Sequence, residues 1–177
     1  MEGKMLTTED RIQQYRAFMR DFTDSIILSH LMDIGFFEAP ASTKYHGNYP
    51  GGLFDHSLVV AEELLRLTKC LNLEWERNRS PFIVGMYHDL CKCDSYEKEG
   101  GGYIYSPNDS FPGHGAKSVM VLSQIHQLTE EEVYCIRYYM GAYEKEEWNY
   151  YDRAIRKYPN VLWTHTADMS ASKIHNV

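Results

Sequence analysis

Cysteine and long apolar runs are both scarce in this sequence. Four cysteines in 177 residues are too few for a disulfide scaffold, and Cys91 and Cys93 stand only two positions apart. We expect all four to stay reduced, because disulfides belong mainly to oxidising compartments and small secreted domains. No run approaches the roughly 18 apolar residues of a membrane span, and the first 20 residues contain no apolar core of a signal peptide. These absences predict a cytoplasmic protein with no membrane partner.

Basic residues are the scarcer charged class, with 18 Lys and Arg against 25 Asp and Glu and a net charge of −7. An acidic surface repels phosphate backbones, so general nucleic-acid binding is not expected. If the substrate is an anion, a local feature must reverse this field, and a bound cation does so most simply. The 44% of hydrophobic residues can form a substantial core. We therefore expect a single globular domain over residues 1–177.

The dominant periodicity is helical. Apolar residues between Leu53 and Leu71 recur at spacings of three, four and seven, which is typical of an amphipathic helix. Further helices are expected at about residues 7–21, 24–34, 82–91, 115–127, 129–141, 151–157 and 160–174. Between residues 94 and 112 the helical period fails, and Gly100–Gly102 followed by Tyr103-Ile104-Tyr105 predicts a short hairpin or flap. The predicted fold class is all-α, a helical bundle.

Ionisable residues interrupt the apolar faces of these helices. His56 lies on the apolar stripe of its helix, where a core histidine bonded to a carbonyl group is the alternative to a ligand. The doublet His88-Asp89 follows the apolar segment 82–87. A carboxylate buried there must be paired or bound to metal, so a structural ion pair is the alternative. Asp168 shares a helical face with Val161 and His165, unless it is a solvated or capping residue.

Imidazole and carboxylate groups from three helices would make a mixed nitrogen and oxygen ligand set. Such a set suits one divalent transition metal ion (Mn, Fe, Co, Ni or Zn) better than Ca. It also leaves coordination positions open for water and substrate oxygens.

These residues and their order resemble the HD-domain superfamily of metal-dependent phosphohydrolases over about residues 46–172. The matching pieces are His56 in Gly51–Ser57, the doublet in His88–Lys92, and Asp168 in His165–Asp168. The resemblance implies an HD-type helical bundle around a buried metal. It also implies hydrolysis of a phosphomonoester or phosphodiester by a metal-bound water, on a small phosphorylated substrate of nucleotide type. The metal ligands implied are His56, His88, Asp89 and Asp168.

The same resemblance names further site residues. Besides Asp89, the implied catalytic residues are Lys92, which would face a phosphate or the attacking water, and His114, which would contact the substrate or donate a proton. A solvated position is the alternative for both. His46, Tyr139 and His165 are candidates for contacting the substrate or supporting the ligands.

Two-metal members usually carry a histidine where this chain has Tyr139. A neutral tyrosine is a poor ligand for a divalent ion, so we expect one tightly bound ion and at most one weak, substrate-assisted ion. A degenerate HD module that binds metal or nucleotide without turnover is the alternative function. The 14 tyrosines of the chain either stack on a base or pack with their hydroxyls toward water. The sequence does not indicate an oligomeric state.

Overall fold

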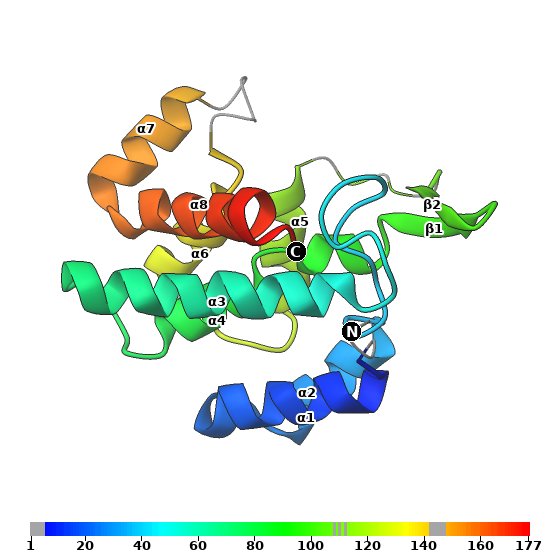
Figure 1. Ribbon diagram of the computed structural model, residues 1–177. Helices are drawn as coiled ribbons and strands as arrows, with labels where there is room; N and C mark the ends of the chain where they lie inside the picture. Colours follow the sequence, from blue (N-terminus) through cyan, green and yellow to red (C-terminus); the bar gives the residue numbers. More distant parts are fainter. Residues whose placement is uncertain (1–5, 108, 110, 112, 142–147) are drawn as a thin grey trace.

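The computed structural model describes residues 6–107, 109, 111, 113–141 and 148–177. The described residues are mostly helical, as expected, and form eight α-helices and one two-stranded hairpin (Figure 1). The helices are α1 (Thr8–Met19), α2 (Ser25–Asp33), α3 (Gly52–Leu71), α4 (Ser80–Tyr87), α5 (His114–Leu122), α6 (Glu130–Arg137), α7 (Trp148–Lys157) and α8 (Asn160–Ser170). A 3₁₀-helical turn covers Leu90–Cys93, and a π-helical turn covers Ala171–His175. None of the described helices is long and apolar enough to cross a membrane.

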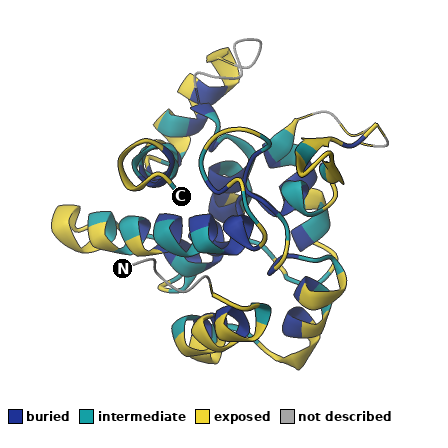
Figure 2. Ribbon diagram, turned by 45° about the vertical axis from the view of Figure 1, so that its right-hand side comes forward, coloured by how far each residue is buried: buried dark blue, intermediate teal, exposed yellow. Residues whose placement is uncertain are grey.

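Helix α3 runs through the middle of the molecule and packs against α4 on one side and α8 on the other (Figure 1). Its apolar stripe is buried over the first turns, at Leu53, Val60 and Leu64, as the residue spacing predicts. Towards the end of the helix Leu67 is only half-buried and Leu71 is exposed. Figure 2 shows buried residues gathered where these helices meet, with exposed residues on the outer faces of α1, α7 and the hairpin. The centre of the molecule is therefore the place where polar groups are most costly and need partners.

The start of α3 is held in place by a glycine and an ion pair. Gly51 precedes the helix with a φ of 83°, a conformation that favours glycine, and a Cβ there would overlap the Arg11 guanidinium. Arg11 makes a bidentate pair with Asp55, with both N···O distances 2.8 Å. Because His56 is the next residue, this pair anchors the turn of α3 that carries it.

Helices α3 and α4 approach closely at Gly85. A Cβ on Gly85 would lie 2.8 Å from the Cβ of Ala61 and closer still to its Cα, so nothing but glycine fits without movement of α3. We expect Gly85→Ala to lower the free energy of unfolding by about 1–3 kcal/mol, as overpacking does, despite the gain of up to about 1 kcal/mol in helix propensity.

Urea denaturation of the metal-free protein measures this effect. Gly102→Ala is the matched control, because its Cβ would have no neighbour nearer than 3.9 Å. The control should change the free energy of unfolding by no more than about 0.5 kcal/mol. Equal stability of the two variants would contradict the close packing of α3 on α4.

The expected hairpin is confirmed. Strand β1 (Tyr96–Glu99) pairs with β2 (Gly102–Tyr105) in antiparallel register, with Tyr96 opposite Tyr105. The two residues of the turn, Gly100 and Gly101, have φ of 56° and 86°. Positive φ at both central positions is typical of the two-residue turns that match strand twist.

Several helices end earlier than the sequence predicts. Helix α4 ends at Tyr87 rather than at residue 91, so the doublet His88-Asp89 lies just beyond the helix. Helices α5 and α6 end at Leu122 and Arg137. The expected helix over 160–174 changes to a π-helical turn after Ser170. Apolar periodicity extends past each of these ends, but the backbone hydrogen bonds change there to those of tighter turns or, after Ser170, of a π-helical turn.

Candidate metal centre

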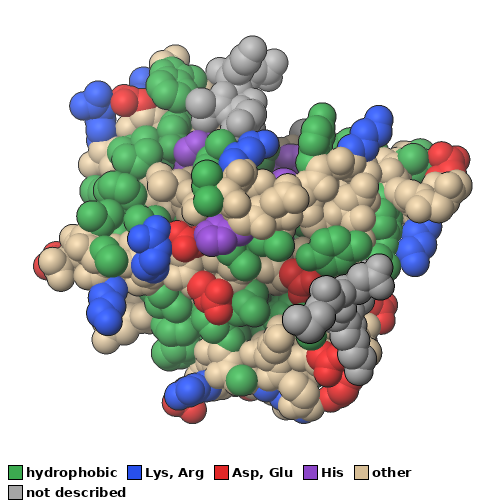
Figure 3. Space-filling model, in the orientation of Figure 1, with side chains coloured by type: hydrophobic (Ala, Val, Ile, Leu, Met, Phe, Trp, Pro, Cys, Tyr) green, Lys and Arg blue, Asp and Glu red, His purple; other side chains and the backbone are tan. Residues whose placement is uncertain are grey.

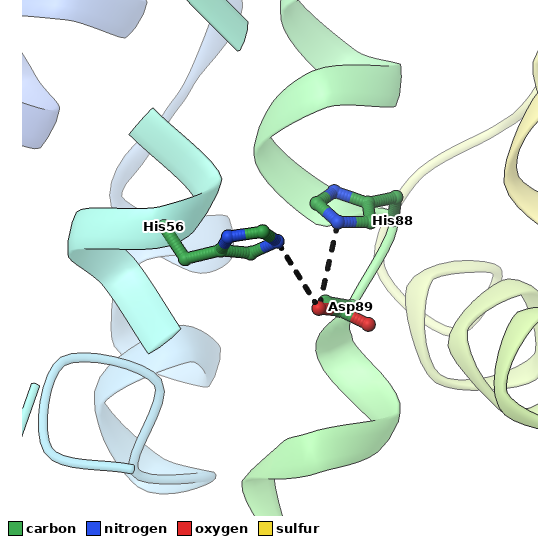
Figure 4. Close-up of side chains that lie close together, drawn as sticks. All are labelled: His56, His88 and Asp89. Atoms are coloured by element: carbon green, nitrogen blue, oxygen red, sulfur yellow. Dashed lines mark ion pairs between the residues drawn. The ribbon is translucent and has the colours of Figure 1, made fainter. Parts of the chain in front are cut away.

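Three fully buried side chains converge where α3 meets the end of α4 (Figure 4). His56 comes from α3, and His88 and Asp89 follow α4. The Asp89 Oδ2 atom lies 3.6 Å from His56 Nε2 and 3.5 Å from His88 Nε2. One ligand atom from each residue lies within 4.8 Å of the others. This spacing is suited to a single metal ion between them.

The break in the helix at the doublet allows both of its side chains to face the same point. Successive residues of a regular helix point about 100° apart. At Asp89 the backbone leaves the helical region, with φ −110° and ψ 17°. The earlier helix end is therefore a local requirement of the site, because a continuous helix would turn the doublet apart.

Both histidines are oriented through their Nδ1 atoms. His88 Nδ1 lies 2.9 Å from the carbonyl oxygen of Gly85, and His56 Nδ1 lies 2.9 Å from the backbone oxygen of Val177. A backbone oxygen only accepts, so each Nδ1 carries the hydrogen and each Nε2 keeps a lone pair for the centre. This is the arrangement that supports metal-binding histidines in proteins.

The atoms that face the centre have no hydrogen bonds among the described residues. They are His56 Nε2, His88 Nε2 and Asp89 Oδ2, all buried. Leaving a buried polar atom without a hydrogen bond costs about 1–3 kcal/mol. Asp89 Oδ2 has the ammonium of Lys92 as an ionic neighbour, but both Nε2 atoms face carboxylate oxygens, which have no hydrogen to donate, so a cation at this point would be a partner for both nitrogens. Two imidazole nitrogens and a carboxylate oxygen fit a divalent transition metal ion. The residues present therefore fit the expected metal.

Asp168 of α8 lies beside this cluster. Its Oδ1 atom is 3.1 Å from His56 Nε2 and 3.8 Å from His88 Nε2. Burial acts to raise its pKa, but its contact with His56 lowers the pKa below the ordinary value. Asp168 thus remains a carboxylate, and the four residues that the sequence predicts as ligands lie together.

Two further residues hold Asp89. Tyr139, which follows α6, donates its hydroxyl to Asp89 Oδ1. Burial, and then the Asp89 carboxylate, raise the pKa of Tyr139 well above its ordinary value, so it stays a neutral donor. Lys92 Nζ lies 2.6 Å from Asp89 Oδ2. Burial acts to raise the pKa of Asp89, but the ammonium of Lys92 and then His88 hold it well below the usual range.

Lys92 is not solvated, which removes that alternative. Its side chain is only 12% exposed and lies in the 3₁₀ turn after the doublet. Burial acts to lower its pKa, but Asp89 outweighs burial and raises it. Burial likewise lowers the pKa of His88, and Asp89 again raises it above the ordinary value. The site is therefore a coupled group of buried charges, held together by Asp89.

A cavity of about 270 Å³ leads to this cluster from the surface. Lys92, Tyr139 and Asp168 line it, together with His46 and His114. In Figure 3, histidine side chains (purple) reach the surface near the middle of the face shown, beside basic side chains (blue). The cavity gives a small molecule access to the candidate metal centre.

The two cavity histidines are neutral at pH 7. Burial, and then His56, lower the pKa of His46 to about 4, and its ring lies 4.9 Å from that of His56. Burial also lowers the pKa of His114, whose Nδ1 lies 3.4 Å from the sulfur of Cys91. His114 is half-buried at the start of α5 rather than solvated. Both imidazoles are placed to contact a ligand in the cavity.

His165 does not line the cavity. Its Nδ1 atom lies 2.8 Å from the carbonyl oxygen of Tyr139, and its ring packs against Gly141 and Tyr151. His165 thus supports the segment that carries Tyr139. Of the two roles that the sequence leaves open for His165, contact with the substrate and support of the ligands, this contact fits the second.

Some parts of the site were not predicted from the sequence. The supporting oxygens of Gly85 and Val177 belong to the backbone and leave no side-chain signal. Lys173 lies at the mouth of the cavity, but in the sequence it cannot be told from any other charged residue near a helix end. The sequence predicts Tyr139 as a candidate for contacting the substrate or supporting the ligands, but it does not predict the hydrogen bond from its hydroxyl to Asp89.

One curated protein is similar to part of the chain. Over 70 residues the chain is 37% identical to the dihydroneopterin 2',3'-cyclic phosphate phosphodiesterase of Methanocaldococcus jannaschii. The aligned region covers 37% of this chain and 28% of the length of that protein. The chain is similar to a phosphodiesterase over part of its length. No protein-family model matches the chain, and no solved structure matches it significantly.

Proposed function

We propose that this protein is a metal-dependent phosphohydrolase of the HD type, acting on the phosphate ester of a small nucleotide-like molecule. The observation that carries the proposal is the set of three converging buried atoms, on His56, His88 and Asp89, that have no hydrogen bonds among the described residues. Lys92 and Asp168, which contact this set, line an open cavity. The partial similarity to a phosphodiesterase supports the same reaction class. The chain would form an HD-type bundle with one domain.

The ligands proposed are His56, His88, Asp89 and Asp168. When bound, a divalent ion supplies Lewis-acid polarisation of a phosphoryl oxygen and acidifies a water molecule. The chain's own contribution is to aim both Nε2 atoms at the centre, through the Nδ1 contacts with backbone oxygens, and to keep both carboxylates charged.

Lys92 and His114 are the proposed catalytic groups besides Asp89. The ammonium of Lys92 at the cavity floor would stabilise negative charge that develops on the phosphoryl oxygens. His114 would hydrogen-bond the substrate or pass a proton to the leaving oxygen. Of the described residues that line the cavity, Lys92 and Lys173 are cationic and Asp168 is acidic. With a divalent ion bound, these two lysines would make the cavity attractive to an anion, even though the whole chain is acidic.

A phosphodiester is the first substrate to test. The similar protein is named for a 2',3'-cyclic phosphate, and a five-membered cyclic diester is compact enough to enter a cavity of about 270 Å³ with its phosphate at the floor. The experiment measures hydrolysis of nucleoside 2',3'-cyclic phosphates, bis-p-nitrophenyl phosphate and p-nitrophenyl phosphate with added Mn, after metal analysis of the purified protein. Bound metal with turnover supports the proposal.

The alternative is a module that binds metal or nucleotide without turnover. It is favoured by Tyr139, which stands where two-metal members carry a histidine and donates its hydroxyl to Asp89. Metal content without hydrolysis of any of these substrates would establish this alternative. Absence of bound metal under all conditions would contradict both functions.

Metal affinity should depend on pH through His88. Asp89 raises the pKa of His88, so the proton competes with the metal at a higher pH than it does for a free imidazole. Affinity should fall as the pH is lowered through this raised pKa, by up to about tenfold per pH unit for each proton displaced. Calorimetric titrations between about pH 8 and about pH 6 measure this fall. An affinity that stays constant over this interval would show that His88 is not a ligand.

Tyr139 should determine the number of ions. Its hydroxyl occupies Asp89 Oδ1, the oxygen that a second ion would need from a bridging carboxylate. Tyr139→His removes that hydroxyl and supplies a ring nitrogen, so bound metal should rise from about one toward about two ions per chain. Metal analysis after gel filtration is the measurement, and Tyr139→Phe, which adds no ligand, is the control. Two ions in the unmutated protein would contradict the assignment.

A further inference from the structure

Besides Tyr139, three further tyrosines line the cavity that leads to the candidate metal centre. They are Tyr45 of the loop before α3, and Tyr96 and Tyr105 of the hairpin. Tyr45 is 79% exposed and Tyr105 is 62% exposed. Single exposed aromatic residues are ordinary. These two differ because they come from separate segments of the chain and border the same cavity.

The hairpin fixes the position of Tyr105. Tyr96 and Tyr105 are directly opposite in the register, and such partners project from the same face of a sheet. Their ring centroids are 5.2 Å apart with an angle of 64°, an edge-to-face contact. Tyr96 is half-buried and lies beside Lys92 in the cavity wall. Tyr96 therefore supports the exposed ring from below.

The loop before α3, drawn in cyan beside the hairpin (Figure 1), brings Tyr45 to the same cavity. Ser42 Oγ accepts from the backbone N–H of Tyr45 at 2.8 Å and donates to the carbonyl oxygen of His46 at 2.7 Å. His46 packs its ring against His56, a proposed metal ligand. Tyr45 is thus held at a defined place relative to the centre.

We propose that Tyr45 and Tyr105 bind a planar heterocyclic ring of the substrate, while its phosphate lies on Lys92. The cavity lining combines charged groups, among them Lys92 and Asp168, with aromatic and apolar side chains, to which Met140 and Met169 contribute. A ligand complementary to both kinds of group carries a phosphate ester and a flat ring in one molecule. This inference names the substrate class of the proposed phosphohydrolase and rests on that function for its kinetic test.

Stacking on an aromatic side chain does not depend on the identity of the ring, because every heterocyclic base has a π-face. The two tyrosines should therefore distinguish substrates with a ring from those without one, rather than one base from another. The ring, not the hydroxyl, supplies the interaction, so phenylalanine should replace either tyrosine.

The test compares two cyclic diesters, adenosine 2',3'-cyclic phosphate and glycerol 1,2-cyclic phosphate. We expect Tyr105→Ala and Tyr45→Ala each to lower kcat/KM for the adenosine compound about 5- to 100-fold, mainly through KM. The same variants should leave the glycerol compound within about twofold. Tyr105→Phe and Tyr45→Phe should restore the unmutated values. Equal losses on both compounds would overturn the proposal.

Tyr103→Ala is the matched control. Tyr103 lies on the same strand as Tyr105, opposite Lys98, and does not line this cavity. It should leave kcat/KM for both compounds unchanged. A loss as large as that of Tyr105→Ala would show that the variants act by disrupting the hairpin, which would overturn the role of Tyr105.

A binding measurement separates this proposal from the proposed function. Calorimetry with Mn-loaded protein would compare adenosine 3'-monophosphate with glycerol 3-phosphate. If no compound is hydrolysed, yet adenosine 3'-monophosphate binds more tightly and Tyr105→Ala removes the difference, the catalytic function fails and the ring site stands. If both cyclic compounds are hydrolysed equally well by the unmutated protein, the ring site fails and the catalytic function stands.

Discussion

Asp89→Asn should leave the protein without bound metal and without hydrolytic activity. The substitution keeps the size of the side chain but removes the negative charge from a fully buried group. It takes one carboxylate oxygen from the ligand set and leaves the buried ammonium of Lys92 without the partner now 2.6 Å away. Breaking a buried pair in this way costs about 3–5 kcal/mol, so the unfolding free energy should fall as well. Metal analysis, an activity assay and urea denaturation measure the three effects.

Asp168→Asn should also lose metal but should destabilise the protein less. Its side chain is 14% exposed and has no buried lysine as its partner. Asp152→Asn is the control for both variants, since Asp152 is half-exposed and pairs with Arg156 on the outer face of α7. The control should keep the full metal content. Full metal content in both Asp89→Asn and Asp168→Asn would show that the ion, if any, binds elsewhere.

Lys92→Met should separate catalysis from metal binding. Methionine keeps most of the length and apolar character of the side chain while it removes the ammonium from the floor of the cavity. Loss of a preorganised charge at a developing oxyanion lowers kcat about 10²- to 10³-fold. The metal content should stay complete, because Lys92 is not one of the proposed ligands. The substitution also removes a positive charge next to Asp89, which would otherwise repel a bound cation.

Lys173→Met is the matched control for this result. Lys173 is exposed at the mouth of the same cavity, so its loss should weaken substrate binding slightly and leave kcat nearly unchanged. Should Lys92→Met lose its metal together with its activity, Lys92 would be a positioning residue for Asp89. Unchanged kcat in Lys92→Met would remove it from the catalytic machinery altogether.

The clustering of the four candidate ligands could be predicted because these residues conflict with the apolar pattern around them. An imidazole on the buried stripe of α3 and a carboxylate after the apolar helix α4 each require a partner. His56, His88, Asp89 and Asp168 indeed lie together. The conflict is visible in the sequence alone, since it depends on residue type and helical spacing.

The end of α4 could not be predicted in the same way. Residues 82–91 have the composition of one continuous buried helix, and no glycine or proline interrupts them after Gly85. What stops the helix is a set of tertiary contacts, in which Asp89 is held by Tyr139, fifty residues away, and by Lys92. Contacts of this kind depend on the assembled fold, which local periodicity does not report.

The contact between His56 and Val177 joins residues 121 positions apart in the chain. Together with Asp168 on α8, it means that residues of the last quarter of the sequence complete a centre begun by α3. During synthesis, α3 and α4 emerge before α8. Until α8 has been made, His56 and His88 lack the neighbouring carboxylate of Asp168. Contacts so distant in sequence form late in folding. Metal loading should therefore be among the last events in the maturation of this protein, and a nascent chain that stops before α8 would offer an ion an unfinished ligand set.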